Sequence, residues 1–355
     1  MSGCLAGIID VLEQNKPERS KAYFHYCRKP VLEKFLMPNA EIFCTHTCYL
    51  NDDREIKEGC DRFLSFLSSE KGFSGSVIEM LRENIDMNIN RFDPRTKNLP
   101  NVMPWTFSVS EADDAPYQWK NYADCQAGGY CIAFNSEKLE EAITAVNRAN
   151  AQSMLPAEKR AILVFLPCMY LDFDDALIAK CFHAAYRDCE EAFERVKGSM
   201  PKKDCDKSSG VQVLSAIFFV SALIKRGRYR HEREWRLILH ATDSVKRDYE
   251  MVAGKPRLRT LLSAGVSGRV TDLVCQVMCS PQGDIKALTR HAQLLLQKCG
   301  SILHVYASAV NPSVVRNYIT RCPVEKDYED YVVERTADNP SASVVPQEEW
   351  KLRLR

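Results

Sequence analysis

The sequence predicts an α+β fold with a mixed or antiparallel β-sheet and a helical insertion. Short stretches rich in aromatic and β-branched residues recur across the first half of the chain and return near its end, and longer stretches with helical spacing of apolar residues lie between them. These stretches do not follow the regular strand-helix alternation of a doubly wound fold. The chain shows no internal repeat and no low-complexity block.

The predicted strands are short and apolar. The first, KAYFHY at 21–26, is aromatic and ends against a proline at position 30. Gly128 and Gly129 form the turn into a later strand and are not a dinucleotide fingerprint, because the pattern Gly-x-Gly-x-x-Gly is missing. Further strands are predicted at 41–49, 105–109, 130–134, 161–166, 232–240, 273–278 and 301–307.

Helices are predicted where apolar residues repeat every three or four positions. The polar loop GSMPKKDCDKSSG joins two of them, and the tail TADNPSASVVPQEE is predicted to be loose. The predicted helices are 31–37, two within 61–90, 137–150, 173–196, 211–225 and 283–299.

Composition limits the class of protein. A chain of 355 residues with 45% hydrophobic content can form one large domain or two modest ones. Its 48 Lys and Arg balance 47 Asp and Glu, so net charge gives no reason to expect nucleic acid or an anionic membrane as partner. Fifteen cysteines without regular spacing favour reduced thiols. The opening lacks a cleaved signal peptide, and no apolar run could span a bilayer, which predicts a soluble protein.

Two motifs have ordinary explanations. Cys44, His46 and Cys48 are metal-capable, but they come from one extended stretch without a second ligand pair at zinc spacing, so buried thiols and no metal site are predicted. A basic cluster could hold phosphates or nucleic acid, or it could be a solvated loop leading into a strand. Its members are Lys225, Arg226, Arg228, Arg230 and Arg233.

Two carboxylates lie two residues apart in the predicted strand 232–240. Glu232 and Glu234 would share one face of that strand, while Arg233 and Trp235 would lie on the other. Structure alone rarely selects two like charges on one face. The alternative is an exposed strand face whose carboxylates pair with nearby arginines.

Two other segments could complete a site. The segment 51–55, NDDRE, brings carboxylates to the end of a predicted strand, although Asn-Asp at such a position is usually a turn or a helix cap. A set of aromatic and hydroxyl residues is suited to a flat heterocycle such as nicotinamide or adenine, and core packing would explain the same residues. These are Trp105, Phe107, Ser108, Trp119 and Tyr122.

Six segments in this order resemble CteC-like ADP-ribosyltransferases, a bacterial family. They are YFHYC (23–27), YLNDDRE (49–55), FS (107–108), QWKNYAD (118–124), GGYCIAF (128–134) and HEREWRLIL (231–239). The resemblance runs from position 23 to about position 310. The family looks like a chimera of diphtheria-toxin-like and cholera-toxin-like transferases and is characterised by an Asp-Glu catalytic pair. In this chain the pair corresponds to Asp52 and Glu234.

The resemblance implies an enzyme that uses NAD⁺ as co-substrate. Glu234 would stabilise the oxocarbenium-like ribose left when nicotinamide departs, and Asp52 would activate an acceptor hydroxyl, with Asp53 as the neighbouring alternative. Cys27 stands where relatives of the motif usually carry Thr. The residues expected to bind the cofactor are His25, Tyr26, Ser108, Trp119, Tyr122 and Glu232.

The same resemblance implies a protein acceptor, with a threonine of host ubiquitin as the sharpest case, in a bacterial protein that stays in the cytoplasm or reaches the host cytosol without a cleaved signal. The alternatives are a transferase in phage defence acting on nucleic acid or an endogenous protein, a plain NAD⁺ hydrolase, or a catalytically silent NAD-binding module. A monomer is predicted. The transferase core would comprise 1–136 and 226–320 with strand 161–166, the helical insertion at 137–225 would recognise the acceptor or simply cover the sheet, and 321–355 would form a tail.

Overall fold

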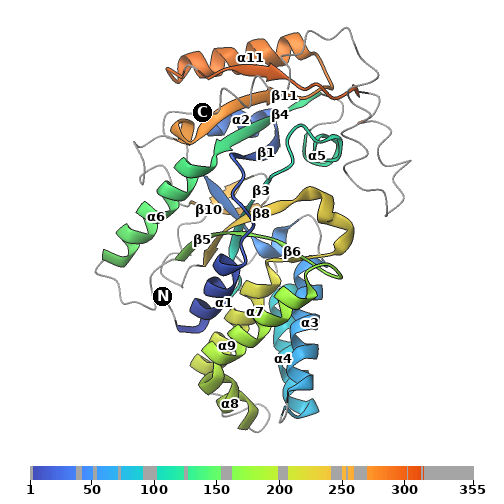
Figure 1. Ribbon diagram of the computed structural model, residues 1–355, viewed down its shortest axis with the longest axis vertical. Helices are drawn as coiled ribbons and strands as arrows, with labels where there is room; N and C mark the ends of the chain where they lie inside the picture. Colours follow the sequence, from blue (N-terminus) through green and yellow to red (C-terminus); the bar gives the residue numbers. More distant parts are fainter. Residues whose placement is uncertain are drawn as a thin grey trace.

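The computed structural model has the predicted α+β fold class, with helices packed on both sides of a large mixed sheet (Figure 1). It describes residues 3–36, 42–50, 54–70, 73–90, 102–123, 127–152, 162–198, 207–240, 250–252, 255–259, 270–301, 303–312 and 315. The predicted tail at 321–355 and most of the predicted polar loop lie outside these residues. Among the described helices, none is long and apolar enough to cross a membrane.

The strands and helices have the following bounds. The strands are β1 (Ala22–Arg28), β2 (Phe43–His46), β3 (Trp105–Ser110), β4 (Gly129–Asn135), β5 (Ile162–Pro167), β6 (Met169–Tyr170), β7 (Ile224–Lys225), β8 (Glu234–His240), β9 (Glu250–Val252), β10 (Lys255–Arg259), β11 (Val274–Cys279) and β12 (Val305–Ala307). The α-helices are α1 (Gly3–Gln14), α2 (Lys29–Phe35), α3 (Glu55–Ser69), α4 (Gly75–Asn90), α5 (Pro116–Tyr122), α6 (Ser136–Gln152), α7 (Asp175–Asp188), α8 (Glu190–Gly198), α9 (Lys207–Ser221) and α11 (Ile285–Lys298), and the 3₁₀ helices are η1 (Thr47–Tyr49), η4 (Gly227–Glu232) and η6 (Val270–Asp272).

The large sheet consists of two parts that meet at β3. One part runs β12-β11-β4-β1, and the other contains β2, β3, β8 and β5, with β10 and β9 continuing beyond β2. Within the described residues β1 and β3 pair at one position, where Phe24 lies opposite Ser110. On the same edge of β3, pairing with β2 is confined to Trp105 and Thr106. The stretch of β3 between these contacts therefore has an open edge.

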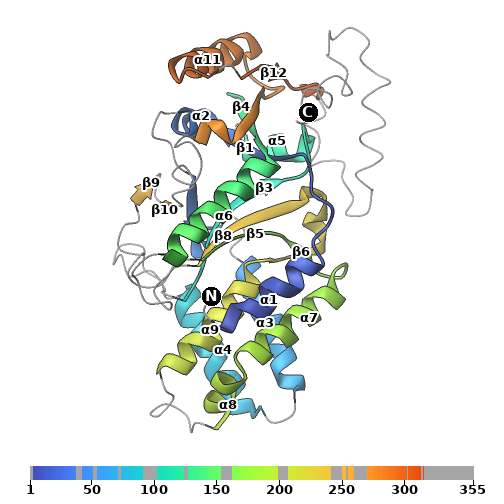
Figure 2. The same ribbon diagram turned by 60° about the vertical axis from the view of Figure 1, so that its left-hand side comes forward.

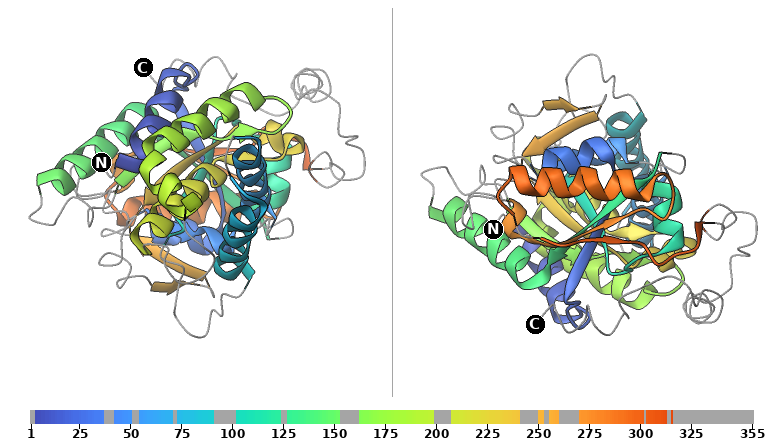
Figure 3. Two further views of the ribbon diagram at one scale, coloured as in Figure 1. Left: turned by 90° about the horizontal axis from the view of Figure 1, so that it is seen from below. Right: turned by 90° about the horizontal axis from the view of Figure 1, so that it is seen from above.

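Three apolar cores hold the layers together. The largest joins the helical bundle α1, α3, α4, α7, α8 and α9 to the lower face of β5 and β8, as Figure 2 shows. The second lies between the opposite face of the sheet and helices α2, α6 and α11. A third, smaller core packs α5 against β1 and β4. Seen from the two ends of the molecule, the bundle and α11 lie on opposite sides of the sheet (Figure 3).

The local sequence explains several of these elements. Strand β4 is buried along nearly its whole length, which accounts for its nearly continuous apolar sequence. Strand β8 is equally buried, although it carries Glu234 and Arg236. Helix α2 carries a proline in its first turn, and α11 begins where the Asp284 carboxylate accepts a hydrogen bond of 3.0 Å from the Ala287 N–H.

The packing of the helices cuts across the predicted domain boundaries at two places. Helix α6, assigned to the insertion at 137–225, packs on β4 and β5 in the sheet core. Helices α1, α3 and α4, assigned to the transferase core, belong to the bundle. The reason is that apolar periodicity identifies a helix and its buried face but not the partner that covers this face.

Several predicted elements also differ in extent. The strand predicted at 41–49 is β2 followed by η1, the helix predicted at 173–196 is divided into α7 and α8, and the helix predicted at 211–225 ends at Ser221. Helices α1 and α5 and strands β6, β7, β9 and β10 were not predicted from the sequence.

Candidate functional site

A cavity of about 590 Å³ lies where the two parts of the sheet separate. Its wall is formed by β1, β2, β3, α5, β7, η4, β8 and β10, so both parts of the sheet contribute. The cavity follows from the open edge of β3, because β1 turns away beyond Phe24 and β2 reaches only Thr106. Residues 107 to 109 therefore face the cavity along an edge that no strand covers in the described part of the chain.

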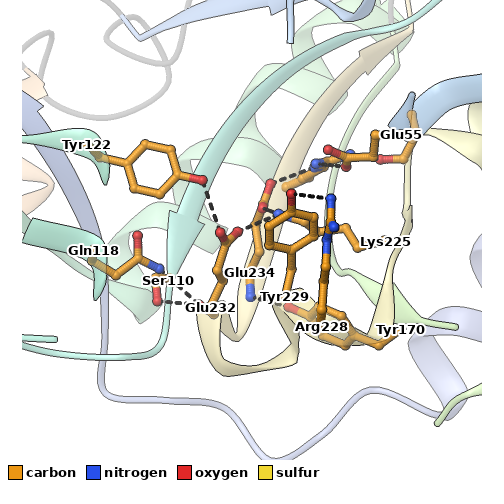
Figure 4. A network of polar contacts seen from close by, with 12 residues as sticks. Glu55, Ser110, Gln118, Tyr122, Tyr170, Lys225, Arg228, Tyr229, Glu232 and Glu234 are labelled. Atoms are coloured by element: carbon orange, nitrogen blue, oxygen red, sulfur yellow. Dashed lines mark hydrogen bonds and ion pairs between the residues drawn. The ribbon is translucent and has the colours of Figure 1, made fainter. Parts of the chain in front are cut away.

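A row of buried charged side chains forms one wall of this cavity (Figure 4). The Lys225 ammonium contacts the carboxylates of both Glu232 and Glu234. The other oxygen of Glu234 accepts a hydrogen bond of 2.7 Å from Nε of Arg236. Nη2 of the same guanidinium contacts the Glu55 carboxylate. The signs alternate along the row Glu55, Arg236, Glu234, Lys225, Glu232, and all five residues are at most 7% exposed.

The two carboxylates next to Lys225 have pKa values that shift in opposite directions. Burial tends to raise the pKa of Glu234, but Arg236 and Lys225 outweigh it and hold that pKa well below its usual range. A hydrogen bond with the Ser108 side chain acts in the same direction. The pKa of Glu232 is raised, because burial and the neighbouring Glu234 outweigh its contact with Lys225. Glu234 is therefore held ionised, and Glu232 is the one of the two that takes up a proton more readily.

Glu232 and Glu234 converge by a route that differs from the predicted one. Strand β8 begins only at Glu234, and Glu232 is the last residue of η4. Arg233 between them has φ 44° and ψ 48°, a left-handed conformation that no continuous strand contains. The prediction of a strand over 232–240 was therefore wrong at its start, and the turn at Arg233 together with Lys225 brings the carboxylates together.

Neighbouring elements hold Glu232 and Tyr122 in place. The Glu232 main-chain oxygen accepts hydrogen bonds from the Ser110 hydroxyl at 2.6 Å and from the Gln118 amide at 3.3 Å. The Tyr122 hydroxyl donates to the Glu232 carboxylate at 3.2 Å, and burial followed by Glu232 raises the pKa of that phenol. Tyr122 and Ser108 thus both line the cavity beside the carboxylates, as the sequence predicted for a ligand site.

His25 borders the same cavity from β1. Its Nδ1 lies 2.9 Å from the main-chain oxygen of Ser108, and because a carbonyl can only accept, Nδ1 carries the proton and Nε2 is an acceptor. Burial, opposed by this bond and assisted by Arg257, lowers the pKa of His25 to about 4, which keeps the ring neutral. The ring packs 4.5 Å from Phe107 between centroids. Since Phe107 and Ser108 have side chains on opposite faces of β3, His25 and the Ser108 hydroxyl approach the cavity from different sides.

Two residues expected to bind a cofactor have structural roles instead. Trp119 does not line the cavity: it is fully buried in the small core, and its indole N–H donates to Asp114 at 2.7 Å. Tyr26 borders the cavity, but its hydroxyl donates to the Ala112 carbonyl and accepts from the Ala115 N–H, both at 2.9 Å. The sequence could not separate these aromatic residues from ligand-binding ones because composition does not show which face of an element is covered.

Three further cationic side chains, from β1 and β10, line the cavity. These are Arg28, Lys255 and Arg257. The Arg257 guanidinium contacts the Thr45 hydroxyl, and Lys255 Nζ donates to the Tyr49 carbonyl at 3.0 Å. Burial lowers the pKa of both groups, and for Lys255 the neighbouring Arg257 lowers it further. One cavity is thus lined by the row of alternating charges and by three further cations.

The remaining sequence candidates have different outcomes. Asp52 and Asp53 lie outside the described residues, so the structure places neither. Cys44 belongs to the sheet core, whereas Cys48 packs against the helical core, and the described residues contain no group of three His, Cys, Asp or Glu side chains arranged for a metal ion. Lys225, assigned from sequence to a basic cluster, is buried among carboxylates.

About a third of the chain is similar to a known protein family. No curated protein and no solved structure matches the chain. Residues 118–237 match the model of DUF2971, a family of proteins of unknown function. The matched segment contains Lys225, Glu232, Glu234 and Arg236, but it leaves out His25, Ser108 and Glu55. The chain is therefore similar to DUF2971 over the part that supplies most of the charged row.

Proposed function

We propose that this chain is an NAD⁺-dependent mono-ADP-ribosyltransferase with Glu234 as its central catalytic residue. The observation that carries the proposal is the set of charges that line the cavity, which combines a buried, ionised carboxylate with cationic side chains from β1 and β10. NAD⁺ carries complementary charges, because its nicotinamide ring is positively charged and its diphosphate is negatively charged. A volume of about 590 Å³ lies within the usual range for ligand sites.

The proposed reaction breaks the bond between C1′ of the ribose and the nicotinamide nitrogen. The bonding electron pair leaves with nicotinamide, which becomes neutral, and the positive charge moves onto the ribose. The Glu234 carboxylate stabilises this developing charge in the transition state. An acceptor oxygen then bonds to C1′ and gives its proton to a base. The leaving group is already cationic, so this reaction needs no Lewis acid to drive departure.

Several residues would position the dinucleotide. Arg257 and Arg28 would bind the diphosphate through charge-assisted hydrogen bonds. Ser108 and Tyr122 would contact the ribose or the nicotinamide amide, and neutral His25 would offer a hydrogen bond from the other side. In this proposal the Glu232 carboxylate is already bound by the Lys225 ammonium, so Glu232 supports Glu234 and does not contact the acceptor.

The acceptor belongs to the same proposal. The segments that resemble CteC-like transferases support a protein hydroxyl, with a threonine of ubiquitin as the first acceptor to test. Asp52, three residues before Glu55, is the proposed base. Replacement of Asp52 by Asn should then reduce transfer to protein more than hydrolysis of NAD⁺ by water, and radiolabelled NAD⁺ measures both products. Equal loss of the two would assign Asp52 to cofactor binding.

Glu234→Gln tests the core of the proposal. The amide keeps the shape of the side chain but removes its charge, so nicotinamide release should fall by roughly a hundredfold to a thousandfold, the range for loss of one preorganised electrostatic contact. Because Glu234 lies between two buried cations, unfolding free energy should also fall by about 1–3 kcal/mol. Glu194→Gln, which alters an exposed ion pair on α8, is the matched control and should change neither quantity. A folded Glu234→Gln variant with full activity would exclude the proposed role.

A further inference from the structure

Within the described residues, Lys225 is the one cation that contacts the carboxylates of both Glu232 and Glu234 beside the cavity. It is 4% exposed and comes from β7, a two-residue strand that pairs in parallel with β6. Its ammonium also lies 5.2 Å from the centroid of the Tyr229 ring. Lys225 is therefore held by its strand, by an aromatic ring and by two carboxylates, and is not a mobile surface lysine.

Two buried carboxylates this close together repel each other unless a cation lies between them. Without Lys225, Glu234 would keep Arg236 and its hydrogen bond with Ser108. Glu232 would keep the neutral hydroxyls of Tyr122 and Tyr117 but no cation named above. Removal of one partner from a buried ion pair leaves an uncompensated charge, which is strongly unfavourable. The carboxylates would then separate, or one of them would take up a proton.

The contacts of Lys225 also restrict orientation. Arg236 and Lys225 bind different oxygens of Glu234, so together they fix the plane of the carboxylate. Without Lys225, the second oxygen of Glu234 would lose its cation, and Arg236 and Ser108 would be left to orient the group. Both cations depend on the helical bundle: Lys225 follows α9, and Arg236 contacts Glu55 in the first turn of α3 and the main-chain oxygen of Ala222.

We propose that Lys225 is a positioning residue that holds Glu232 and Glu234 as one rigid unit and fixes the plane of the Glu234 carboxylate toward the cavity. The expected effect of Lys225 on kcat rests on the proposed function. Positioning by Lys225 also gives the helical bundle a role in aligning the site.

The double variant Lys225→Met/Glu232→Gln, compared with Glu232→Gln alone, tests the inference. Lys225→Met by itself could unfold the protein, but the double variant removes one charge of each sign and keeps the formal charge of the row. Compared with Glu232→Gln, its kcat for nicotinamide release should fall roughly a hundredfold, the order expected when a catalytic group loses its alignment by about an ångström. KM for NAD⁺ should change less than about threefold, since a contact that acts mainly in the transition state affects kcat.

The pH profile separates positioning from a general loss of structure. With Lys225 gone, the Glu234 carboxylate loses one of its two stabilising cations, so the acid limb of activity should move to higher pH. Titration of ¹³C-labelled glutamate side chains, with the Glu234 signal identified by its loss in Glu234→Gln, should show the same direction without NAD⁺. Lys225→Arg should restore part of the activity. Lys197→Met, which removes a surface cation 2.9 Å from Glu194, is the control and should leave kcat and the titration unchanged.

The outcomes are distinguishable. If the unaltered protein releases no nicotinamide, the proposed function fails, and the carbon titration still tests whether Lys225 controls Glu234. If the double variant matches Glu232→Gln in kcat, in its acid limb and in the titration, Lys225 does not position Glu234 and the inference is overturned.

Discussion

Arg257 is a half-buried arginine at the cavity. It lines the cavity from β10, contacts the Thr45 hydroxyl, and has its pKa lowered by burial. A desolvated guanidinium of this kind gains more from an anionic ligand than an exposed one does, because the local dielectric is low. This side chain is therefore the best test of where a diphosphate would bind.

Arg257→Met should weaken binding of ADP roughly tenfold to a hundredfold, as expected for loss of a charge-assisted hydrogen bond worth about 1.5–3 kcal/mol. The KM for NAD⁺ should rise by a similar factor while kcat stays nearly constant. Calorimetric titration with ADP measures the first effect without any reaction. Arg82→Met, on α4 in the bundle, is the control. If Arg257→Met lowered kcat and left ADP binding unchanged, Arg257 would belong to the catalytic wall instead.

Helices α3 and α9 pack so closely at one point that only glycine fits. A Cβ atom on Gly59 would lie 2.7 Å from Cα of Ser221, which is a backbone atom that cannot move by itself. These two helices carry Glu55 and lead to Lys225, so their separation sets the geometry of the charged row. A change at Gly59 should therefore reach the site although Gly59 does not line the cavity.

Gly59→Ala should lower the free energy of unfolding by about 1–3 kcal/mol, the usual range for overpacking, and should lower kcat as the helices move apart. Thermal unfolding and nicotinamide release measure the two effects. Gly75→Ala is the matched control, because a Cβ there would meet nothing within 4 Å. It should be neutral or raise stability by up to about 1 kcal/mol. Equal behaviour of the two variants would show that the α3–α9 contact is tolerant.

Elements of the fold differ in how far the sequence could predict them. Strands β1, β3, β4, β5 and β11 were predicted within about two residues, because each is a local apolar run with clear boundaries. Strand β7 was read as the end of a helix. A strand of two residues is too short to show a periodic sequence pattern. Its partner, β6, lies more than fifty residues earlier in the chain.

The candidate site was predictable only in part for the same reason. Glu234 and Ser108 lie on predicted strands, and their neighbourhood follows from the pairing of β3 with β8. Lys225 and Arg257 reach the cavity through non-local pairs that the sequence does not signal. The left-handed conformation of Arg233 was equally hidden, because glycine is the residue that usually marks such a position.

Stability of the whole molecule should fall as the pH drops from about 6.5 to 4. Burial lowers the pKa of both His25 and His231 to about 4, and for His231 the charge of Lys225 acts in the same direction. A histidine whose folded pKa lies below its unfolded value of about 6.5 favours folding above pH 6.5 and loses this contribution as the pH falls toward the folded value.

Thermal unfolding from pH 7 to pH 4 should show this decline. Each histidine contributes separately to stability. His25→Gln or His231→Gln should therefore make the unfolding temperature depend less on pH between pH 7 and pH 4. His183→Gln, which alters a side chain that is 61% exposed, should not. An unaltered slope in both buried variants would show that other groups control acid sensitivity. The low pKa of Glu234 places its own contribution at lower pH, where stability is lost as that carboxylate protonates.

The alternating charged row has a consequence for how related chains can diverge. The two cations each contact two carboxylates, so one neutral replacement of Lys225 or Arg236 leaves the carboxylate at the end of the row, Glu232 or Glu55, without its cation. Two replacements of opposite sign at adjacent members avoid this. Mutational paths through positions 55, 225, 232, 234 and 236 should therefore pass through compensated pairs, and chains that have lost Lys225 should also have lost Glu232. Substitutions at these five positions should then be correlated. A substitution that is harmful alone should be tolerated when its neighbour in the row also changes.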